Sequence, residues 1–411
     1  MADEPADPVA PATGGYVAIA RKWRPSTLEE MSGQAHVTRT LKNSLTSGRL
    51  HHAFLFTGAR GVGKTTAARA FARALQCAEG PTPTPCGVCG PCRDILAGTC
   101  TDVVEIDGAS NNSVEDVRNL RDGVRYLPAS ARFRVYVIDE VHMLSKAAFN
   151  ALLKTLEEPP PHVKFIFATT EVNKIPDTIL SRVQRFDFKR IPATVVAARL
   201  RLICDAEHVP ISDVGLQMIA RAGEGSMRDA QSLLDQVISF GDASDDKQVA
   251  DILGLVDRKF LYEMLRGVLR NEPERCLDSV QQVYDSGHEL HQFTNELLEL
   301  VRNATIATMS EGARRFLDVS NEEQAVLLDL TAGVPFEQLS RTFQVLLEVH
   351  DQVSRSMRPR LVLEMAVARL VAIRPAQSVG ALVDRLADLE RRLRGQGVAA
   401  PRGHDPEGER R

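Results

Sequence analysis

Residues 58–65 have the sequence GARGVGKT, which fits the pattern G-x-x-x-x-G-K-[ST]. The apolar run AFLF (53–56) comes just before this motif, and the helix-forming segment TAARAFARAL (66–75) follows it. A strand, a glycine loop and a helix in this order are the context that confirms a phosphate-binding P-loop. The alternative, a chance glycine-rich turn before a helix, does not account for both flanks. The stretch therefore predicts an α/β nucleotide-binding fold.

The predicted P-loop supplies the groups that a magnesium–nucleotide complex needs. Its glycines let backbone N–H groups wrap the phosphates at the positive end of the helix dipole. Lys64 is expected to reach the β- and γ-phosphates, and Thr65 to ligate Mg²⁺. We expect the nucleotide to contact the motif and the residue after it: Gly58, Ala59, Arg60, Gly61, Val62, Gly63, Lys64, Thr65 and Thr66.

Short β-rich runs alternate with helical patterns throughout the first half of the chain. Such an alternation predicts a parallel sheet of five strands, covered by helices on both faces. From about Ile191 the β-rich runs cease and amphipathic helices follow, two of them around a Gly-Glu-Gly turn in residues 211–240. The four runs that follow AFLF are DVVEID (102–107), RVYVID (134–139), KFIFATT (164–170) and RFDF (185–188).

An acidic pair follows the third of these strands. Asp139 is a candidate for the magnesium shell, and Glu140 is a candidate to orient or deprotonate the attacking water. Solvated turn acids are the alternative, which the apolar strand and the intact P-loop argue against. Glu140 as the base indicates hydrolysis by water. Thr170, at the end of the fourth strand, is a candidate monitor of the γ-phosphate.

Two arginines indicate nucleotide sensing. Arg182 stands just before the fifth strand, where in a ring of subunits its side chain would act on a neighbour's γ-phosphate as an arginine finger. Arg228 is expected in the first turn of a helix, where a cation opposes the macrodipole and an anionic ligand would compensate. Each arginine alone is more often a surface ion pair. Their order after a P-loop favours the sensing interpretation.

Four cysteines are gathered in CAEGPTPTPCGVCGPC (77–92), with the spacing C-x8-C-x2-C-x2-C. Paired C-x2-C ligands suit a tetrahedral thiolate zinc site, and four closed ligands leave no position for a substrate. The zinc site is thus expected to be structural, with free thiols or a redox pair as the alternatives. Its predicted ligands are Cys77, Cys86, Cys89 and Cys92, whereas Cys100, Cys204 and Cys276 are expected to be small core residues.

Composition bounds the class of protein. Hydrophobic residues make up 44% and charged residues 25% of the 411, typical of a soluble globular protein. No apolar run approaches the roughly 18 residues of a membrane span, and the N-terminus has no apolar signal region. We therefore expect a cytoplasmic chain. The net charge of −4 argues against a general coat of positive charge for nucleic acid.

Taken together, the motifs resemble the clamp-loader branch of the AAA+ ATPases and, within it, the gamma/tau subunits of bacterial DNA polymerase III. The resemblance covers residues 16–250 closely and residues 255–375 only in helical character. The motifs that match in content and order are ARKWRP, GQAHV, GARGVGKT, IDEVHMLS, FNALLKTLEEPP, FATTE, ILSR and GSMRDA.

This resemblance implies roles for individual residues. Thr170 would be sensor 1, Arg182 the finger acting in trans and Arg228 sensor 2, while Arg24 and Pro25 would flank the adenine. The family also carries a zinc module at the position of the four cysteines. One departure is Val183, where the family has a cysteine after the finger arginine. Since the guanidinium does the chemistry, hydrolysis is expected to be intact.

Composition, periodicity and the resemblance together predict a division of the chain. We expect a disordered leader (1–15), an AAA+ domain (16–190) with the zinc insertion (77–92), and a helical lid domain that carries sensor 2 (191–254). An all-α oligomerisation collar (255–375) and a short helix with a disordered tail (376–411) would follow.

The implied assembly is a ring-like pentamer that opens a sliding clamp and places it on primed template DNA at replication forks, in association with the nucleoid. Its partners would be delta- and delta-prime-type subunits, copies of this chain, the clamp and, if a longer form exists, the polymerase III core. Lys154 is a candidate DNA contact facing the central chamber, with a solvated helix lysine as the alternative. Residues 109–116 are expected to begin a helix that could hold a phosphate, although related sequences are more basic there.

Two other functions are compatible with parts of the sequence. A non-hydrolysing scaffold subunit of the same assembly would typically lack a working P-loop. A branch-migration helicase of the AAA+ class would not be expected to carry the cysteine insertion or an all-α C-terminal third. The motor subunit is therefore the leading hypothesis.

Overall fold

The computed structural model describes residues 16–110, 120, 122–241, 243–317, 319, 321–373 and 386–392. The predicted leader (1–15), most of the predicted helix start at 109–116 and most of the tail (376–411) lie outside these residues. The chain forms two compact units, the first ending at Leu253 and the second beginning at Gly254. The predicted domain boundaries remain predictions.

The first unit contains the predicted parallel sheet. All five strands form where the β-rich runs are, and they lie in the order β2-β3-β4-β1-β5. The register aligns Thr57 with Thr169 and Asp107 with Asp139, so the carboxyl ends of the strands meet at one edge. The strands are β1 (Ala53–Thr57), β2 (Val103–Asp107), β3 (Arg134–Asp139), β4 (Val163–Thr169) and β5 (Gln184–Asp187).

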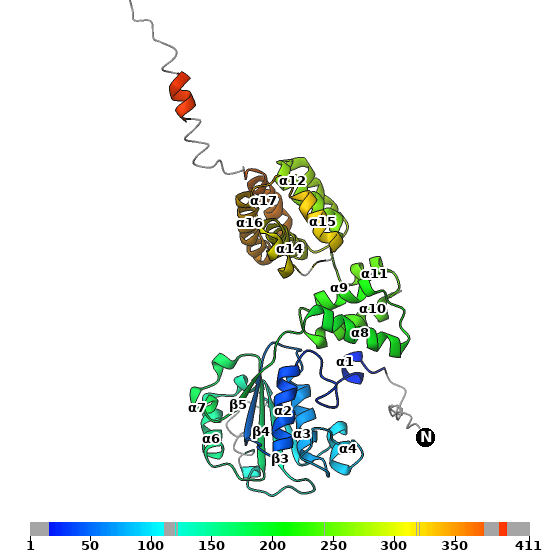
Figure 1. Cartoon of the computed structure of the whole chain (residues 1–411), viewed down its shortest axis with the longest axis vertical. Coiled ribbons are helices and arrows are strands. Elements are labelled where there is room, and N and C mark those ends of the chain that lie inside the picture. Colours follow the sequence, from blue (N-terminus) through cyan, green and yellow to red (C-terminus); the bar gives the residue numbers. More distant parts are fainter. Residues whose placement is uncertain are drawn as a thin grey trace, which may run out of the picture. The chain divides into compact units, whose positions relative to one another are not determined.

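Helices cover both faces of this sheet, as predicted (Figure 1). Phe54 and Phe56 of β1 are fully buried against α2 (Ala35–Ser47) and α3 (Lys64–Gln76). Successive side chains of a strand point to opposite faces, so Leu55 packs into the other layer. That layer contains α6 (Lys146–Glu157) and α7 (Asp177–Leu180). Burying each of these large side chains stabilises the fold by about 1.5–3 kcal/mol.

Local signals set the ends of α6. The side chain of Ser145 accepts a hydrogen bond from the backbone N–H of Ala148 and so caps the helix. The helix ends at Glu157, just before the consecutive prolines that cannot continue it. The shorter elements of this region are α1 (Ile19–Lys22), α4 (Gly90–Ala97), η1 (Val141–Met143) and η2 (Val172–Lys174).

Four helices complete the first unit. They bury Leu200, Ile219 and Leu234 in a common core, which also includes Cys204 and Ile19 of α1. The expected Gly-Glu-Gly turn joins the second and third of them. These helices are α8 (Ala193–Glu207), α9 (Asp213–Ala222), α10 (Met227–Phe240) and α11 (Asp246–Ile252).

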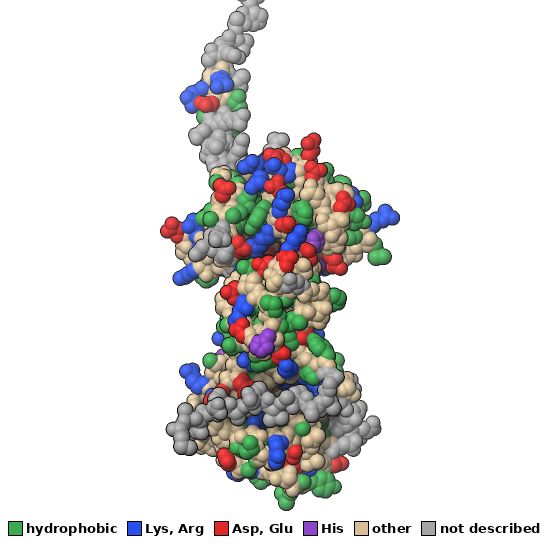
Figure 2. Space-filling model, turned by 90° about the vertical axis from the view of Figure 1, so that its right-hand side faces the viewer, with side chains coloured by type: hydrophobic (Ala, Val, Ile, Leu, Met, Phe, Trp, Pro, Cys, Tyr) green, Lys and Arg blue, Asp and Glu red, His purple; other side chains and the backbone are tan. Residues whose placement is uncertain are grey.

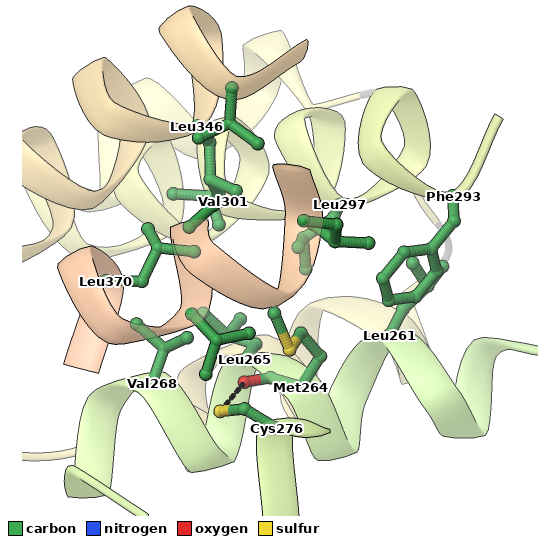
Figure 3. Packing of buried hydrophobic residues seen from close by; sticks show 14 of the residues in the cluster. Leu261, Met264, Leu265, Val268, Cys276, Phe293, Leu297, Val301, Leu346 and Leu370 are labelled. Atoms are coloured by element: carbon green, nitrogen blue, oxygen red, sulfur yellow. Dashed lines mark hydrogen bonds between the residues drawn. The ribbon is translucent and has the colours of Figure 1, made fainter. Parts of the chain in front are cut away.

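The second unit is entirely helical in its described residues. Figure 3 shows its core, in which Leu265 of α12 and Leu370 of α17 are among the buried side chains. The thiol of Cys276 donates a hydrogen bond to the carbonyl oxygen of Met264 over 3.7 Å, and burial raises the pKa of this thiol to about 12. Its elements are α12 (Arg258–Arg270), α13 (Pro273–Asp285), α14 (Leu290–Met309), η3 (Glu311–Phe316), α15 (Asn321–Leu330), α16 (Phe336–Arg355) and α17 (Pro359–Val371). Residues 386–392 form a further short helical segment.

The surface carries both signs of charge. Figure 2 shows basic and acidic side chains mixed on the face in view, in keeping with the net charge of −4. None of the described helices is both long enough and apolar enough to span a membrane.

Candidate functional site

The P-loop connects β1 to α3 with a run of left-handed glycines. Gly61 has φ 73° and Gly63 has φ 101°, a region that side-chain-bearing residues rarely adopt. Gly63 caps α3, so Lys64 is the first residue of the helix and the N–H groups of the first turn point into the loop. The sequence therefore builds the predicted phosphate cradle at a helix N-terminus.

Space above this loop is limited by the lid helix α10. A Cβ atom at Gly61 would lie 1.8 Å from the Oγ of Ser226, the residue that caps α10. The backbone N–H of Arg228 also donates to the carbonyl oxygen of Gly61 over 3.4 Å. Arg228 lies in the first turn of α10, as predicted, and is exposed. The structure thus brings the predicted sensor arginine to the P-loop.

Lys64 is directed back onto the loop that contains it. Its Nζ donates hydrogen bonds to the carbonyl oxygens of Gly58 (2.9 Å) and Ala59 (2.8 Å), and the residue is only 5% exposed. Burial lowers the pKa of Lys64, while the nearby Glu140 and Asp139 carboxylates act in the opposite direction. The ammonium group is therefore held at the loop by two carbonyl oxygens, with the two carboxylates nearby.

Thr65 and Asp139 meet across the edge of the sheet. The Oγ1 of Thr65 donates a hydrogen bond to Oδ2 of Asp139 over 2.5 Å. The other carboxylate oxygen of Asp139 accepts from the backbone N–H of Glu140 over 2.9 Å. Hydroxyl and carboxylate oxygens are ligands that Mg²⁺ prefers, so this pair can hold the metal of a magnesium–nucleotide complex.

Glu140 is oriented by a polar cluster. Its backbone is left-handed (φ 45°), a strained conformation that is typical of functional sites. One carboxylate oxygen accepts from the Oγ1 of Thr170 (3.1 Å) and lies 3.3 Å from Nδ1 of His142. Sequence reasoning missed His142, which also contacts the Oγ1 of Thr169 (3.0 Å). Its position two residues after the acidic pair was the available signal.

Arginines gather beside the P-loop helix. Burial lowers the pKa of Arg24, and the neighbouring cations Arg69 and Arg228 add to this effect while Glu105 opposes it. Arg69 of α3 forms an ion pair with Glu105 of β2 at 2.6 Å. Arg69 was not predicted from the sequence, because nothing in the local pattern distinguishes it from an arginine on the solvent-exposed face of a helix. Pro25, next to Arg24, is half-buried.

Two predicted residues contact other parts of the fold. The guanidinium of Arg182 donates hydrogen bonds to Glu157 of α6 (2.9 Å), to the carbonyl oxygen of Thr178 (2.7 Å) and to the hydroxyl of Ser181 (3.0 Å). Lys154 is exposed on α6, where its side chain is accessible. The hydrogen bonds of Arg182 do not reach the P-loop of its own chain, and Lys154 lies on the exposed surface of α6.

The four predicted zinc ligands come together. The Sγ atoms of Cys77, Cys86, Cys89 and Cys92 all lie within 4.8 Å of one another. Cys77 ends α3 and Cys89 caps α4, so two helix ends position the cluster. A tetrahedral zinc site with Zn–S bonds of about 2.3 Å needs sulfur atoms about 3.8 Å apart, so the donor set fits zinc.

The thiols of this cluster differ in acidity. Burial raises the pKa of Cys92 to about 12, although the neighbouring Arg73 guanidinium acts in the opposite direction. For Cys89, hydrogen bonds from the backbone of Ala78 and Cys92 outweigh the effect of burial and lower the pKa to about 7. Outside the cluster, Cys204 and Cys276 are buried core residues as expected, but Cys100 is only half-buried.

Comparison with known proteins gives the family. Three family models match consecutive parts of the chain, and one relative, the DNA polymerase III subunit gamma of Buchnera aphidicola, is 42% identical over 287 residues. That match covers 70% of this chain and 80% of the Buchnera protein. The chain belongs to the DNA polymerase III gamma/tau family. The models are DNA polymerase III, delta subunit (residues 33–192), DNA polymerase III clamp loader subunit, ATPase lid domain (195–243) and DNA polymerase III subunits gamma and tau domain III (244–386).

Longer members of the gamma/tau family are similar over most of this chain. The tau subunit of Bacillus subtilis is 39% identical over 356 residues, which cover 86% of this chain and 63% of that protein. The tau subunit of Escherichia coli is 42% identical over 364 residues, covering 88% and 56%. The chain therefore spans 56–63% of the length of these tau subunits. Among solved structures, one similar chain is the Thermotoga maritima RuvB Holliday junction branch migration motor. The match covers 60% of this chain and 79% of the RuvB chain, with 21% sequence identity and a TM-score of 0.43.

The one departure from the gamma/tau pattern has a packing explanation in this chain. Val183, next to Arg182, is half-buried and packs against the apolar cluster between the sheet and α6. A valine side chain fills this position with apolar surface. The hydrogen bonds of the Arg182 guanidinium run to Glu157 of α6 and Thr178 of α7, not to Val183.

Proposed function

We propose that this chain is the ATP-hydrolysing motor subunit of a bacterial clamp loader, which places a sliding clamp on primed DNA during replication. The observation that carries the proposal is the hydrogen bond between Thr65 and Asp139, which joins an intact P-loop to the acidic pair at the end of β3. A scaffold subunit that does not hydrolyse ATP has no need of this combination.

The residues around the P-loop divide the work of hydrolysis. Thr65 and Asp139 would hold Mg²⁺, which when bound neutralises charge on the phosphate oxygens. Lys64 supplies a cation to the β- and γ-phosphates in place of the carbonyl oxygens it now contacts. Glu140 orients and deprotonates the attacking water, and Thr170 holds its carboxylate in position.

The remaining site residues recognise the bound nucleotide. Arg228, at the first turn of α10, lies beside the P-loop and acts as sensor 2, while Arg24 and Pro25 flank the adenine. Arg182 is exposed enough to leave Glu157 and reach the γ-phosphate of a neighbouring subunit, where it stabilises charge in the transition state. ATP would then hold subunits together, and hydrolysis would release them.

The cysteine cluster would hold one structural zinc ion. Four thiolates close the coordination shell, so the metal performs no chemistry on a substrate. Its effect is to order a long loop, which presents a surface to another protein. Chelation of the metal is thus expected to alter assembly rather than the P-loop.

The proposed partners are delta- and delta-prime-type subunits, further copies of this chain, the sliding clamp and primed template DNA in the bacterial cytoplasm. Contacts with DNA would be made mostly to phosphates, which position the duplex without reading its sequence. Lys154 is the candidate contact, because its exposed ammonium group is free to meet a phosphate.

The test is the ATPase activity of the chain alone and after addition of the companion subunits, the clamp and primed DNA. Turnover is expected to rise when all are added together. Unchanged turnover would overturn the clamp-loader assignment even if the chain binds ATP. Absence of any hydrolysis in the complete mixture would favour the scaffold subunit instead.

A further inference from the structure

Arg73 lies where α3, the cysteine cluster and the N-terminal segment meet. It stands in the last turn of α3, and only 5% of the residue is exposed. Its Nη1 donates a hydrogen bond to the carbonyl oxygen of Ser26 over 3.1 Å. Its Nη2 faces the cysteine loop, because a Cβ built on Gly87 would lie 2.9 Å from this nitrogen. Gly87 has φ 78°, so the loop takes a glycine-specific turn at this point of close approach.

The guanidinium has no conventional counter-charge. Among the described residues, no carboxylate forms an ion pair with Arg73, and its Nε is buried without a hydrogen-bond partner. An unpaired buried cation is costly, because it loses its hydration without an opposite charge in return. The guanidinium does lie beside the thiol of Cys92, which is itself fully buried. With zinc bound, the thiolates of the cysteine cluster would supply negative charge at this place.

The cluster, for its part, needs a cation. Four thiolates around a divalent zinc ion carry a net charge of about −2. A buried anionic centre of this kind is stabilised by outer-shell groups that donate hydrogen bonds or supply positive charge. Arg73 offers both, and its own side chain is fixed from the opposite side by Ser26.

We propose that Arg73 is the outer-shell cation of the cysteine cluster: it compensates the thiolates and fastens the zinc module to the backbone at Ser26. Retention of zinc then depends on a residue of the nucleotide-binding helix that is not itself a ligand. Ser26 directly follows Arg24 and Pro25, so one side chain joins the zinc module to the segment proposed to contact the adenine. The inference rests on the proposed zinc site.

The test is the rate at which the purified 411-residue chain releases zinc to a metallochromic chelator in the absence of nucleotide. Substitution of an outer-shell partner typically costs about 10- to 100-fold in metal affinity. Arg73→Met removes the charge at similar volume and is expected to release zinc at least about 10-fold faster than the unmodified chain. Arg73→Lys keeps the charge but has a single nitrogen, and is expected to fall between the two.

Arg93→Gln is the matched control. Arg93 is exposed and adjacent to Cys92, so this change removes the same charge near the cluster without removing a buried partner. Its zinc release is expected to equal that of the unmodified chain. Fluorescence of Trp23, the one tryptophan of the chain, reports whether each variant is folded.

The outcomes separate the two levels of the proposal. Zinc bound by the unmodified chain and released no faster from folded Arg73→Met would overturn the role of Arg73 and leave the zinc site standing. No zinc in the unmodified chain would overturn both. If Arg73→Met does not fold, Arg73→Lys decides: faster release than from Arg93→Gln supports the role, and equal release overturns it.

Discussion

The guanidinium of Arg182 donates a hydrogen bond to the carboxylate of Glu157 in the same chain, with a nitrogen–oxygen distance of 2.9 Å. The two side chains are 34% and 51% exposed, and an ion pair as open as this contributes only about 0–1 kcal/mol. Glu157 therefore holds the arginine in one position without binding it tightly. Under the proposed function, loss of this ion pair would add little to the cost of moving Arg182 to a neighbouring subunit's phosphate.

Arg182→Ala is expected to lower ATP hydrolysis by the assembled complex by about 10³-fold or more, since an arginine finger contributes about 10³–10⁵ to kcat. Nucleotide binding by the isolated chain should be retained. Arg185→Ala, which removes an exposed arginine paired with Asp187, is the control and should keep its activity. The measurement is steady-state ATPase activity of the complex.

A mixing experiment separates action in trans from action in cis. An assembly of Lys64→Ala chains alone, or of Arg182→Ala chains alone, is expected to be inactive. A mixture of the two should recover activity. Some subunit interfaces then pair the intact P-loop of one chain with the intact Arg182 of its neighbour. No recovery in a mixed assembly of confirmed composition would contradict the role in trans.

Glu140→Gln is expected to lower hydrolysis by about 10²–10⁴-fold while leaving ATP binding in place, because the amide cannot accept the proton of the attacking water. Steady-state hydrolysis and binding of a fluorescent ATP analogue measure the two properties. Glu158→Gln changes an exposed glutamate of the same domain and serves as the control. A Glu140→Gln chain with normal turnover would exclude this residue as the base.

Cys89→Ser is expected to remove the bound metal, which we expect at about one zinc per chain. Metal analysis of the purified protein by mass spectrometry checks the stoichiometry. Cys204→Ser alters a buried cysteine outside the cluster and should keep its zinc. Equal metal content in the two variants would contradict the assignment of the ligands.

Asp102→Asn is expected to lower the free energy of unfolding of the first unit by about 1–3 kcal/mol. The buried carboxylate of Asp102 accepts from the backbone N–H groups of Ala129 (2.7 Å), Ser130 (2.8 Å) and Ala131 (2.9 Å). Burial alone would raise the pKa of Asp102, but these hydrogen bonds outweigh it and the pKa is lowered. Urea unfolding followed by Trp23 fluorescence measures the loss, with the exposed Asp205→Asn as control.

The difference in stability between the unmodified chain and Asp102→Asn is expected to depend on pH. Because the folded-state pKa of Asp102 is depressed, its contribution is present above the unfolded-state pKa of about 3.9 and is lost as the pH falls through the folded-state value. The stability difference between the unmodified chain and Asp102→Asn should therefore shrink on acidification below about pH 4. A difference that stays constant would show that the carboxylate charge is not involved.

Local patterns were sufficient for the sheet, the P-loop and the cysteine cluster. Each strand is a contiguous apolar run, and Lys64 and Thr65 belong to a motif whose spacing is fixed by the loop itself. Of the two side chains that contact the Glu140 carboxylate, Thr170 was a predicted site residue and His142 was not. His142 reaches Glu140 from the short helix η1, and its place two residues after the acidic pair was the local signal for it.

Long-range contacts were also beyond the sequence. Nothing in the local pattern around Arg73 distinguishes it from Arg69, one turn earlier on α3, yet one is buried beside Cys92 and the other pairs with Glu105. The backbone N–H groups that donate to Asp102 belong to residues 129–131, which are part of no recognised motif.

Ser226 and Gly61 lie so close that the shape of the phosphate cradle is a joint property of two distant stretches of chain. A single added methyl group at residue 61 would press on the cap of α10, with 1.8 Å between Cβ and Oγ, and something would have to shift. The crowding would fall on the side-chain hydroxyl that caps α10, so the loop and the helix cap have to accommodate each other. The P-loop and the start of α10 are therefore in direct contact, through Ser226 and through the backbone N–H of Arg228.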